Sequence, residues 1–178
     1  MQFSRRQFLE TGLCAGAAPL CALGASESGR PAPPNLVYVF ADQFRAFALG
    51  FADADPVHTP NLDRFARESV VFSNAVSNYP VCSPYRGMLM TGQWPHTNGL
   101  YRNCNSRNPD IHLSQDARCF SDVLAENGYD TGYIGKWHLD TPDPANVEYT
   151  EGPRGSGIVW DHYTPPGPRR HGFRFWHA

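Results

Sequence analysis

The sequence has 178 residues, a formal net charge of −2 and 41% hydrophobic residues, which is enough for one packed domain of ordinary size. Its 15 Lys and Arg residues are balanced by 17 Asp and Glu residues and show no cluster that would give a basic face, which argues against a nucleic-acid-binding protein. Sixteen Gly and sixteen Pro between apolar runs favour a loop-rich α/β enzyme with a small-molecule or sugar substrate.

The first 25 residues have the features of an export signal. The segment from Ser4 to Leu9 resembles a twin-arginine motif, and the weakly apolar stretch from Thr11 to Ala25 that follows is too short to span a bilayer. We therefore expect residues 1–25 to be a signal peptide for the twin-arginine translocation machinery, a periplasmic mature protein and no stable membrane anchor. The alternative is the basic N-terminus of a cytoplasmic protein.

Three cysteines follow this segment: Cys82, Cys104 and Cys119. An odd number in an exported protein leaves at least one thiol unpaired or modified. If Cys82 is the modified one, Cys104 and Cys119 either form a disulfide in an oxidising compartment or stay as two free thiols, and the sequence leaves both open.

A single domain, incomplete at its C-terminal end, is expected over residues 35–178, after a Pro-rich linker at 26–34. The continuous apolar run from Asn35 to Phe40 predicts a strand buried on both faces. It ends at Asp42-Gln43, and ligands bind beyond the carboxyl ends of parallel strands, so this pair is a candidate site. The simpler interpretation is a polar strand end that caps a turn.

Further helices and strands alternate along the chain. Thr59-Pro60 and apolar residues at helical spacing predict a helix over about 60–69, followed by a short strand at 70–72. An amphipathic helix from about Phe120 ends at Asn127-Gly128, and a buried strand follows at 131–134. This order predicts an α/β fold with a mostly parallel sheet flanked by helices.

The region after Leu139 is rich in Pro and Gly, with one strand-like piece at 157–160, and is expected to be a long surface excursion. A loop of that length is either functional or part of something larger. Phe175 and Trp176 are followed by no element that would bury them, so we expect the sequence to be truncated. A sheet of three or four strands would leave an unpaired edge and an uncovered apolar face.

The most informative motif is Cys82-Ser83-Pro84-Tyr85-Arg86. Pro84 suits the first turn of a helix, which puts Cys82 at a helix N-terminus, where unpaired amides and the helix dipole favour an anionic tetrahedral group. Arg86, one turn further on, can face back toward position 82. The same surroundings would activate an ordinary nucleophilic cysteine, which is the competing interpretation.

With Thr91-Gly92 behind it, this pattern resembles the signature of the type I sulfatases of the alkaline-phosphatase-like superfamily. In that family a formylglycine-generating enzyme oxidises the cysteine to formylglycine. Other landmarks of the family stand in the same order over about residues 35–140: Asp42 after the first strand, His58-Thr59-Pro60-Asn61-Leu62-Asp63, Trp94-Pro95-His96-Thr97-Asn98-Gly99 and Gly135-Lys136-Trp137-His138-Leu139. Each piece alone is a weak signal, but the ordered set is specific.

The resemblance implies hydrolysis of a sulfate ester on a sulfated small molecule or carbohydrate. Hydrated formylglycine at position 82 would offer two geminal hydroxyls, one to attack sulfur and one to lose its proton and expel sulfate. It also implies a divalent cation, usually Ca²⁺ with Mg²⁺ as the alternative, bound by Asp42 and by the oxygen at position 82. Gln43 stands where many members have a second Asp, and its side-chain carbonyl is an expected ligand.

Lys136 and His138 are two residues apart at a strand end, so in an extended chain both side chains project to the same side. The resemblance makes Lys136 an electrostatic clamp on sulfate and His138 a hydrogen-bond partner or base toward the second hydroxyl. Without the family they are a surface lysine and a stacking histidine. Structural loop roles are expected for His58 and His96.

Residues 169–171, Arg-Arg-His, are expected to be solvated loop charges, although they could touch an anionic substrate. The later metal ligands and the leaving-group acid of the family match nothing after His138, so the chain by itself is expected to be inactive. Two other functions stay open: a phosphodiester or phosphonate monoester hydrolase of the same superfamily, and a non-catalytic exported remnant.

Overall fold

The computed structural model of the protein describes residues 33–142, 157–160 and 162–178. The chain divides into two compact units, one that ends at Phe40 and a second from Ala41 to Ala178. The predicted signal peptide, residues 1–25, and most of the predicted linker lie outside the described residues. Among the residues that are described, no helix is long and apolar enough to cross a membrane.

The strand predicted at 35–40 is wrong. These residues of the first unit adopt neither helix nor strand, and Val37 and Val39 are 86% and 85% exposed. A strand is stable only when a neighbouring strand takes up its backbone hydrogen bonds, and apolar composition does not supply that neighbour. The strands predicted at 70–72 and 157–160 in the second unit are wrong for the same reason.

The second unit begins with short helices. Two 3-10 helices, η1 (Ala46–Ala48) and η2 (Gly50–Ala52), precede α2 (Pro60–Arg67). Pro60 occupies the first turn of α2 as expected, and the helix ends slightly before residue 69. Asp63 in the first turn accepts hydrogen bonds from the Thr59 hydroxyl at 2.7 Å and from the Phe51 amide at 3.1 Å, which connects α2 to η2.

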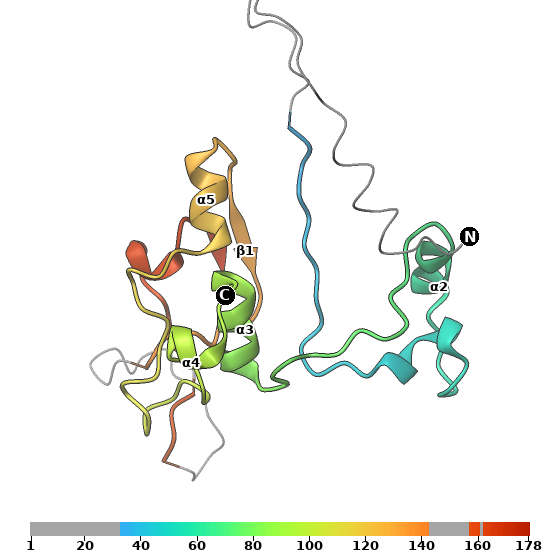
Figure 1. The fold of residues 1–178 in the computed structure, drawn as a ribbon, viewed down its shortest axis with the longest axis horizontal. Coiled ribbons are helices and arrows are strands. Elements are labelled where there is room, and N and C mark those ends of the chain that lie inside the picture. The colour runs from blue at the N-terminus through green and yellow to red at the C-terminus, as the bar shows by residue number, and fades with distance from the viewer. Residues whose placement is uncertain (1–32, 143–156, 161) are drawn as a thin grey trace, which may run out of the picture. The chain divides into compact units, whose positions relative to one another are not determined.

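The predicted helix at Cys82 is confirmed. It is α3 (Cys82–Thr91), which ends on Gly92 at a left-handed φ of 67°, and it packs against the short α4 (Pro95–Asn98) (Figure 1). A Cβ atom added at Gly87 of α3 would lie 2.3 Å from Leu100 Cδ1. The close approach of α3 to the segment after α4 therefore favours glycine at position 87, because a larger residue would force the Leu100 side chain to move.

The last elements form the sheet. α5 (Phe120–Glu126) ends at Asn127-Gly128 as predicted, and β1 (Gly132–Ile134) follows it. β1 pairs in parallel with β2 (Phe175–His177), which follows η4 (Pro168–Arg170), and in this pairing Tyr133 lies opposite Trp176. The fold is therefore α/β with a parallel sheet, as predicted, but among the described residues the sheet has two strands.

A core of buried apolar side chains lies beneath these elements: Met90, Leu100, Cys104, Ile111, Leu113, Cys119, Trp137 and Leu139. Trp176 packs against this core, with ring centroids 5.1 Å from Trp137 and 5.3 Å from Tyr133. The expectation that nothing buries the final aromatic residues is thus wrong for Trp176, because β2 pairs with an earlier strand. Phe175 is 61% exposed.

The cysteines of the described region are not joined by disulfide bonds. Cys104 and Cys119, whose pairing the sequence leaves open, do not form a disulfide in the structure. Both are fully enclosed in the core, where they pack as small apolar side chains.

Candidate active site

The N-terminus of α3 carries the predicted nucleophile. Cys82 is the first helical residue and is half-buried. Val81, which precedes it in an extended conformation, has no side-chain oxygen to cap the helix, and no local cap is formed. The sequence expectation that position 82 lies at a helix entry is confirmed.

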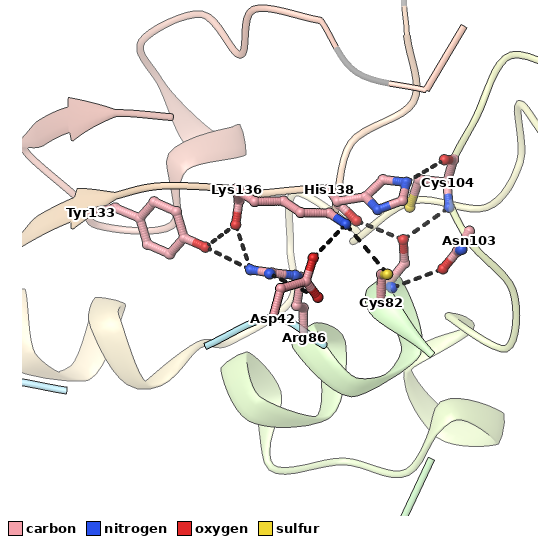
Figure 2. A network of polar contacts seen from close by, with 9 residues as sticks. Asp42, Cys82, Arg86, Asn103, Cys104, Tyr133, Lys136 and His138 are labelled. Atoms are coloured by element: carbon pink, nitrogen blue, oxygen red, sulfur yellow. Dashed lines mark hydrogen bonds and ion pairs between the residues drawn. The ribbon is translucent and has the colours of Figure 1, made fainter. Parts of the chain in front are cut away.

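The segment after β1 brings a cation to this helix end. Lys136 Nζ lies 3.4 Å from Cys82 Sγ and 2.9 Å from Asp42 Oδ2 (Figure 2). The turn that directs Lys136 begins at Gly135, which has a φ of 102° and donates its amide to the His177 carbonyl at 2.8 Å. The parallel pairing of β1 with β2 therefore fixes the start of this segment.

Arg86 supplies a second, immobile cation. Its side chain is only 6% exposed and lies 3.7 Å from Asp42 Oδ1. It donates one hydrogen bond to the Lys136 carbonyl and another, of 3.2 Å, to the Tyr133 hydroxyl. Because the guanidinium is held by neutral acceptors and by one carboxylate, its charge is paired and its direction is fixed.

These contacts set the charge state of the cluster. The pKa of Asp42 is lowered, chiefly because Lys136 donates a hydrogen bond to it, while burial opposes that effect. Burial by itself would lower the pKa of Lys136, but its hydrogen bonds to Asp42 and Cys82 outweigh burial and the pKa is raised. Burial raises the pKa of Tyr133. Near neutral pH, Asp42 is therefore an anion, Lys136 a cation and Tyr133 a neutral phenol.

His138 takes a different direction from Lys136. Its φ of 52° is left-handed, so the chain is not extended there, and the expectation that both side chains project to the same side is wrong. The imidazole is buried, with Nε2 2.9 Å from the Cys104 carbonyl (Figure 2). Its ring meets Trp160 edge-to-face at 6.0 Å. Residue 138 contacts α3 through its backbone: the His138 carbonyl accepts a hydrogen bond of 2.7 Å from the Ser83 hydroxyl.

The structure thus brings together four of the predicted site residues: Asp42, Cys82, Arg86 and Lys136. Gln43 is exposed beside Asp42, and within the described part of the chain no hydrogen bond connects its side chain to the cluster. Sequence reasoning missed Tyr133, Ser83 and Asn103. Ser83 could have been found because it lies within the Cys82–Arg86 motif, whereas no local sequence pattern indicated Tyr133 or Asn103.

The charges at residues 169–171 are not all solvated, contrary to expectation. Arg170 is 9% exposed, donates to the Thr164 carbonyl and covers the Trp176 ring at 5.1 Å. His171 is 3% exposed and faces Asp122 at 3.9 Å. Arg169 forms an ion pair with Asp140 at 3.3 Å. His58 and His96 are exposed.

Cys119, Asp122 and His171 form a second group of ligand types, with their ligand atoms within 4.8 Å of one another. Cys119 and Asp122 already cap α5, because the Cys119 amide donates to Asp122 Oδ2 at 2.9 Å in a reciprocal capping box. Burial, helped by the Asp122 charge, raises the pKa of Cys119 to about 12, and burial lowers the pKa of His171. Cys119 and Asp122 accordingly cap α5, with the Cys119 thiol neutral.

The candidate site thus consists of a cysteine at the entry of α3 with Lys136, Arg86 and Asp42 beside it. The sulfatase family model matches residues 34–167, and the chain belongs to the sulfatase family. An endo-4-O-sulfatase of Bacteroides thetaiotaomicron is 44% identical over 94% of this chain and 35% of its own length. An ulvan-active sulfatase of Formosa agariphila is 41% identical over 85% of this chain and 25% of its own length.

Solved structures agree with this assignment. The crystal structure of yidJ from Bacteroides fragilis superposes with a TM-score of 0.73 and 47% identity, over 84% of this chain and 32% of that protein. The chain therefore spans about a third, or less, of the length of these relatives.

Proposed function

We propose that the full-length protein containing this chain hydrolyses sulfate esters, with formylglycine made from Cys82 as the nucleophile. The observation that carries the proposal is that Lys136 Nζ lies 3.4 Å from Cys82 Sγ at the helix entry, while the buried Arg86 guanidinium, one turn further along the same helix, lies 3.7 Å from Asp42 Oδ1. Two cations and a helix N-terminus around one reactive position suit a substrate with a negative tetrahedral group.

The two cations have different tasks. Arg86 is buried and held by the Lys136 carbonyl and Tyr133, so it provides a fixed charge that orients a sulfate oxygen. The side chain of Lys136 is 34% exposed and reaches both Asp42 and position 82, so its ammonium can follow the charge that develops on the reacting oxygens. His138 is proposed as a partner of the formylglycine hydroxyl, as the family pattern implies.

A divalent cation, Ca²⁺ or Mg²⁺, is proposed beside position 82, with Asp42, Gln43 and the oxygen of residue 82 as ligands. The donor set fits, because it consists of hard oxygen atoms and the Asp42 side chain is 49% exposed and ionised. When bound, such a cation polarises sulfate oxygens as a Lewis acid. Three donors are fewer than the about six to eight oxygens that Ca²⁺ collects, so we expect further ligands from the rest of the full-length protein.

A sulfated carbohydrate is the proposed substrate class, supported by relatives named for ulvan and for N-acetylgalactosamine 6-sulfate. The formylglycine-generating enzyme is the proposed maturation partner. Export to the periplasm by the twin-arginine machinery is proposed from the motif at residues 4–9 and the weakly apolar stretch from Thr11 to Ala25.

Mass spectrometry tests the modification. After expression with a formylglycine-generating enzyme, the peptide that contains Cys82 should lose its thiol and gain an aldehyde, while the peptide with Cys104 keeps its thiol and serves as the internal control. A Cys82 that stays unmodified under these conditions contradicts the proposal.

Paired substrates test the reaction. The matured full-length protein should release nitrophenol from 4-nitrophenyl sulfate faster than from bis(4-nitrophenyl) phosphate, and Cys82→Ala should abolish both activities. A preference for the phosphodiester would instead identify a phosphodiesterase of the same superfamily.

A further inference from the structure

The helix that carries Cys82 starts without a cap of its own. Val81 precedes α3 and offers no side-chain acceptor, although the first amides of a helix have no partner inside the helix. The Ser83 amide nevertheless donates a hydrogen bond of 3.0 Å to Asn103 Oδ1, from a residue 20 positions further along the chain (Figure 2). A remote side chain therefore takes the place of the missing cap.

A second connection lies directly beside the first. The Ser83 hydroxyl, fully buried, donates to the His138 carbonyl at 2.7 Å and accepts the Cys104 amide at 3.0 Å. The turn that contains Cys82 is thus held at two places by the loop at 103–104, and at one place by the segment that presents Lys136.

From these contacts we propose that Asn103 is a positioning residue for the nucleophile, an inference that rests on the proposed function. Asn103 acts through the first turn of α3: by fixing the Ser83 amide, it fixes the direction in which the side chain at position 82 leaves the helix. That direction sets the distance from residue 82 to Lys136 Nζ, which is 3.4 Å in the structure.

The same contact decides which groups bind the anion. An amide at a helix N-terminus is an ordinary donor to sulfate, but the Ser83 amide is already used by Asn103. The Ser83 amide is therefore not among the groups that bind the sulfate, and the side-chain cations Arg86 and Lys136 carry a correspondingly larger share of that task.

Asn103 can be changed with little damage to the fold, because it is only partly buried, whereas Ser83 is fully buried. Asn103→Ala removes the acceptor. Asn103→Asp keeps an oxygen at the same place and should restore the cap, because Asp and Asn cap helices about equally well. Asn108→Ala is the matched control, since Asn108 bonds to Asn105 within the same loop.

Steady-state kinetics of the matured full-length protein, expressed per mole of formylglycine, provide the first test. A misplacement of about 1 Å can cost about 100-fold in rate, so we expect Asn103→Ala to lower kcat roughly 10- to 100-fold with little change in KM. Asn103→Asp should recover most of kcat, and Asn108→Ala should match the wild type. Three outcomes would each overturn the inference: Asn103→Ala has a wild-type kcat, Asn103→Ala changes KM alone, or Asn103→Asp is as slow as Asn103→Ala.

Hydrogen exchange provides a test that does not depend on activity. In the unmodified chain, the Ser83 amide should exchange faster in Asn103→Ala than in the wild type or Asn103→Asp, while the Met90 amide in the last turns of α3 keeps its rate. Unchanged exchange at Ser83 would refute the cap even if sulfatase activity is present. If the wild type lacks formylglycine and activity but Ser83 exchange responds as expected, the proposed function fails and the cap stands. Should Asn103→Ala not fold, Asn103→Ser, whose shorter side chain does not reach the amide, takes its place with the same expected results.

Discussion

Replacing Lys136 by Met removes the ammonium group but keeps a side chain of similar length and apolar volume. Lys136 is the only lysine among the 178 residues of this sequence, so no other amine side chain of this part of the protein can take its place. The change deletes the hydrogen bond to Asp42 and the contact with position 82, and it leaves the carbonyl of residue 136, to which Arg86 donates, unaltered. The effect on rate therefore reports the ammonium group itself.

The geometry sets the expected size of the effect. A unit positive charge 3.4 Å from a unit negative charge gains about 1 kcal/mol in bulk water and about 5 kcal/mol at an effective dielectric constant of about 20. Because the Lys136 side chain is 34% exposed, a value between these limits, about 3 kcal/mol, is appropriate. That corresponds to a loss of about 100-fold in kcat/KM, comparable to the loss of one oxyanion donor in other hydrolases.

The assay is the hydrolysis of 4-nitrophenyl sulfate by the matured full-length protein near neutral pH, with the formylglycine content of each variant measured. Arg169→Met is the matched control, since Arg169 is a cation whose ion pair with Asp140 lies outside the cluster, and it should keep wild-type activity. If Lys136→Met stays within about threefold of the wild type, the ammonium is not stabilising the transition state and the assignment of Lys136 is refuted.

Two further predictions concern stability. Gly87→Ala should lower the free energy of unfolding by about 1–3 kcal/mol in urea titrations, because its Cβ would lie 2.3 Å from Leu100 Cδ1. In a protein that already carries Leu100→Ala, adding Gly87→Ala should cost less than it does in the wild type. A neutral Gly87→Ala variant would contradict the close contact. His171 has a folded-state pKa below its ordinary value of 6.5, so below that pH the unfolded chain binds more protons than the folded one, and stability should fall as the pH drops below about 6.5. In His171→Gln the melting temperature should depend less steeply on pH in this range. An equally steep dependence in the variant would show that His171 is not the group responsible.

The helices were predictable from local signals. Pro60 at a first turn, Pro84 after Cys82 and the Asn127-Gly128 end of α5 all act within a few residues of the chain, and all three helices form where expected. The conformation of residues 35–40 was not predictable in the same way. Their apolar composition is typical of a buried strand, but a strand forms only if a distant segment pairs with it, and composition does not show whether such a segment is present.

The site divides along the same line. Position 82 and Arg86 lie one turn apart on the same helix, as the spacing predicted. Asp42 was a candidate because it follows the predicted strand, and the family resemblance added Lys136. The structure places Asp42 and Lys136 within hydrogen-bonding distance of each other. The orientation of His138 depends on its left-handed φ of 52°. The sequence does not predict this conformation, because non-glycine residues adopt a left-handed φ only in special surroundings. The contact of Asn103 with α3 spans 20 residues and has no local signature.

A primary amine beside the reactive position also affects how the protein can be handled at the bench. Within the 178 residues of this sequence, the lysine that amine-directed reagents can modify is Lys136, 3.4 Å from the sulfur of Cys82. Coupling the protein to a sensor surface through its amines, or labelling it with a succinimidyl dye, would therefore block the candidate active site of those molecules in which Lys136 reacts, whereas attachment through a terminal tag would leave it open.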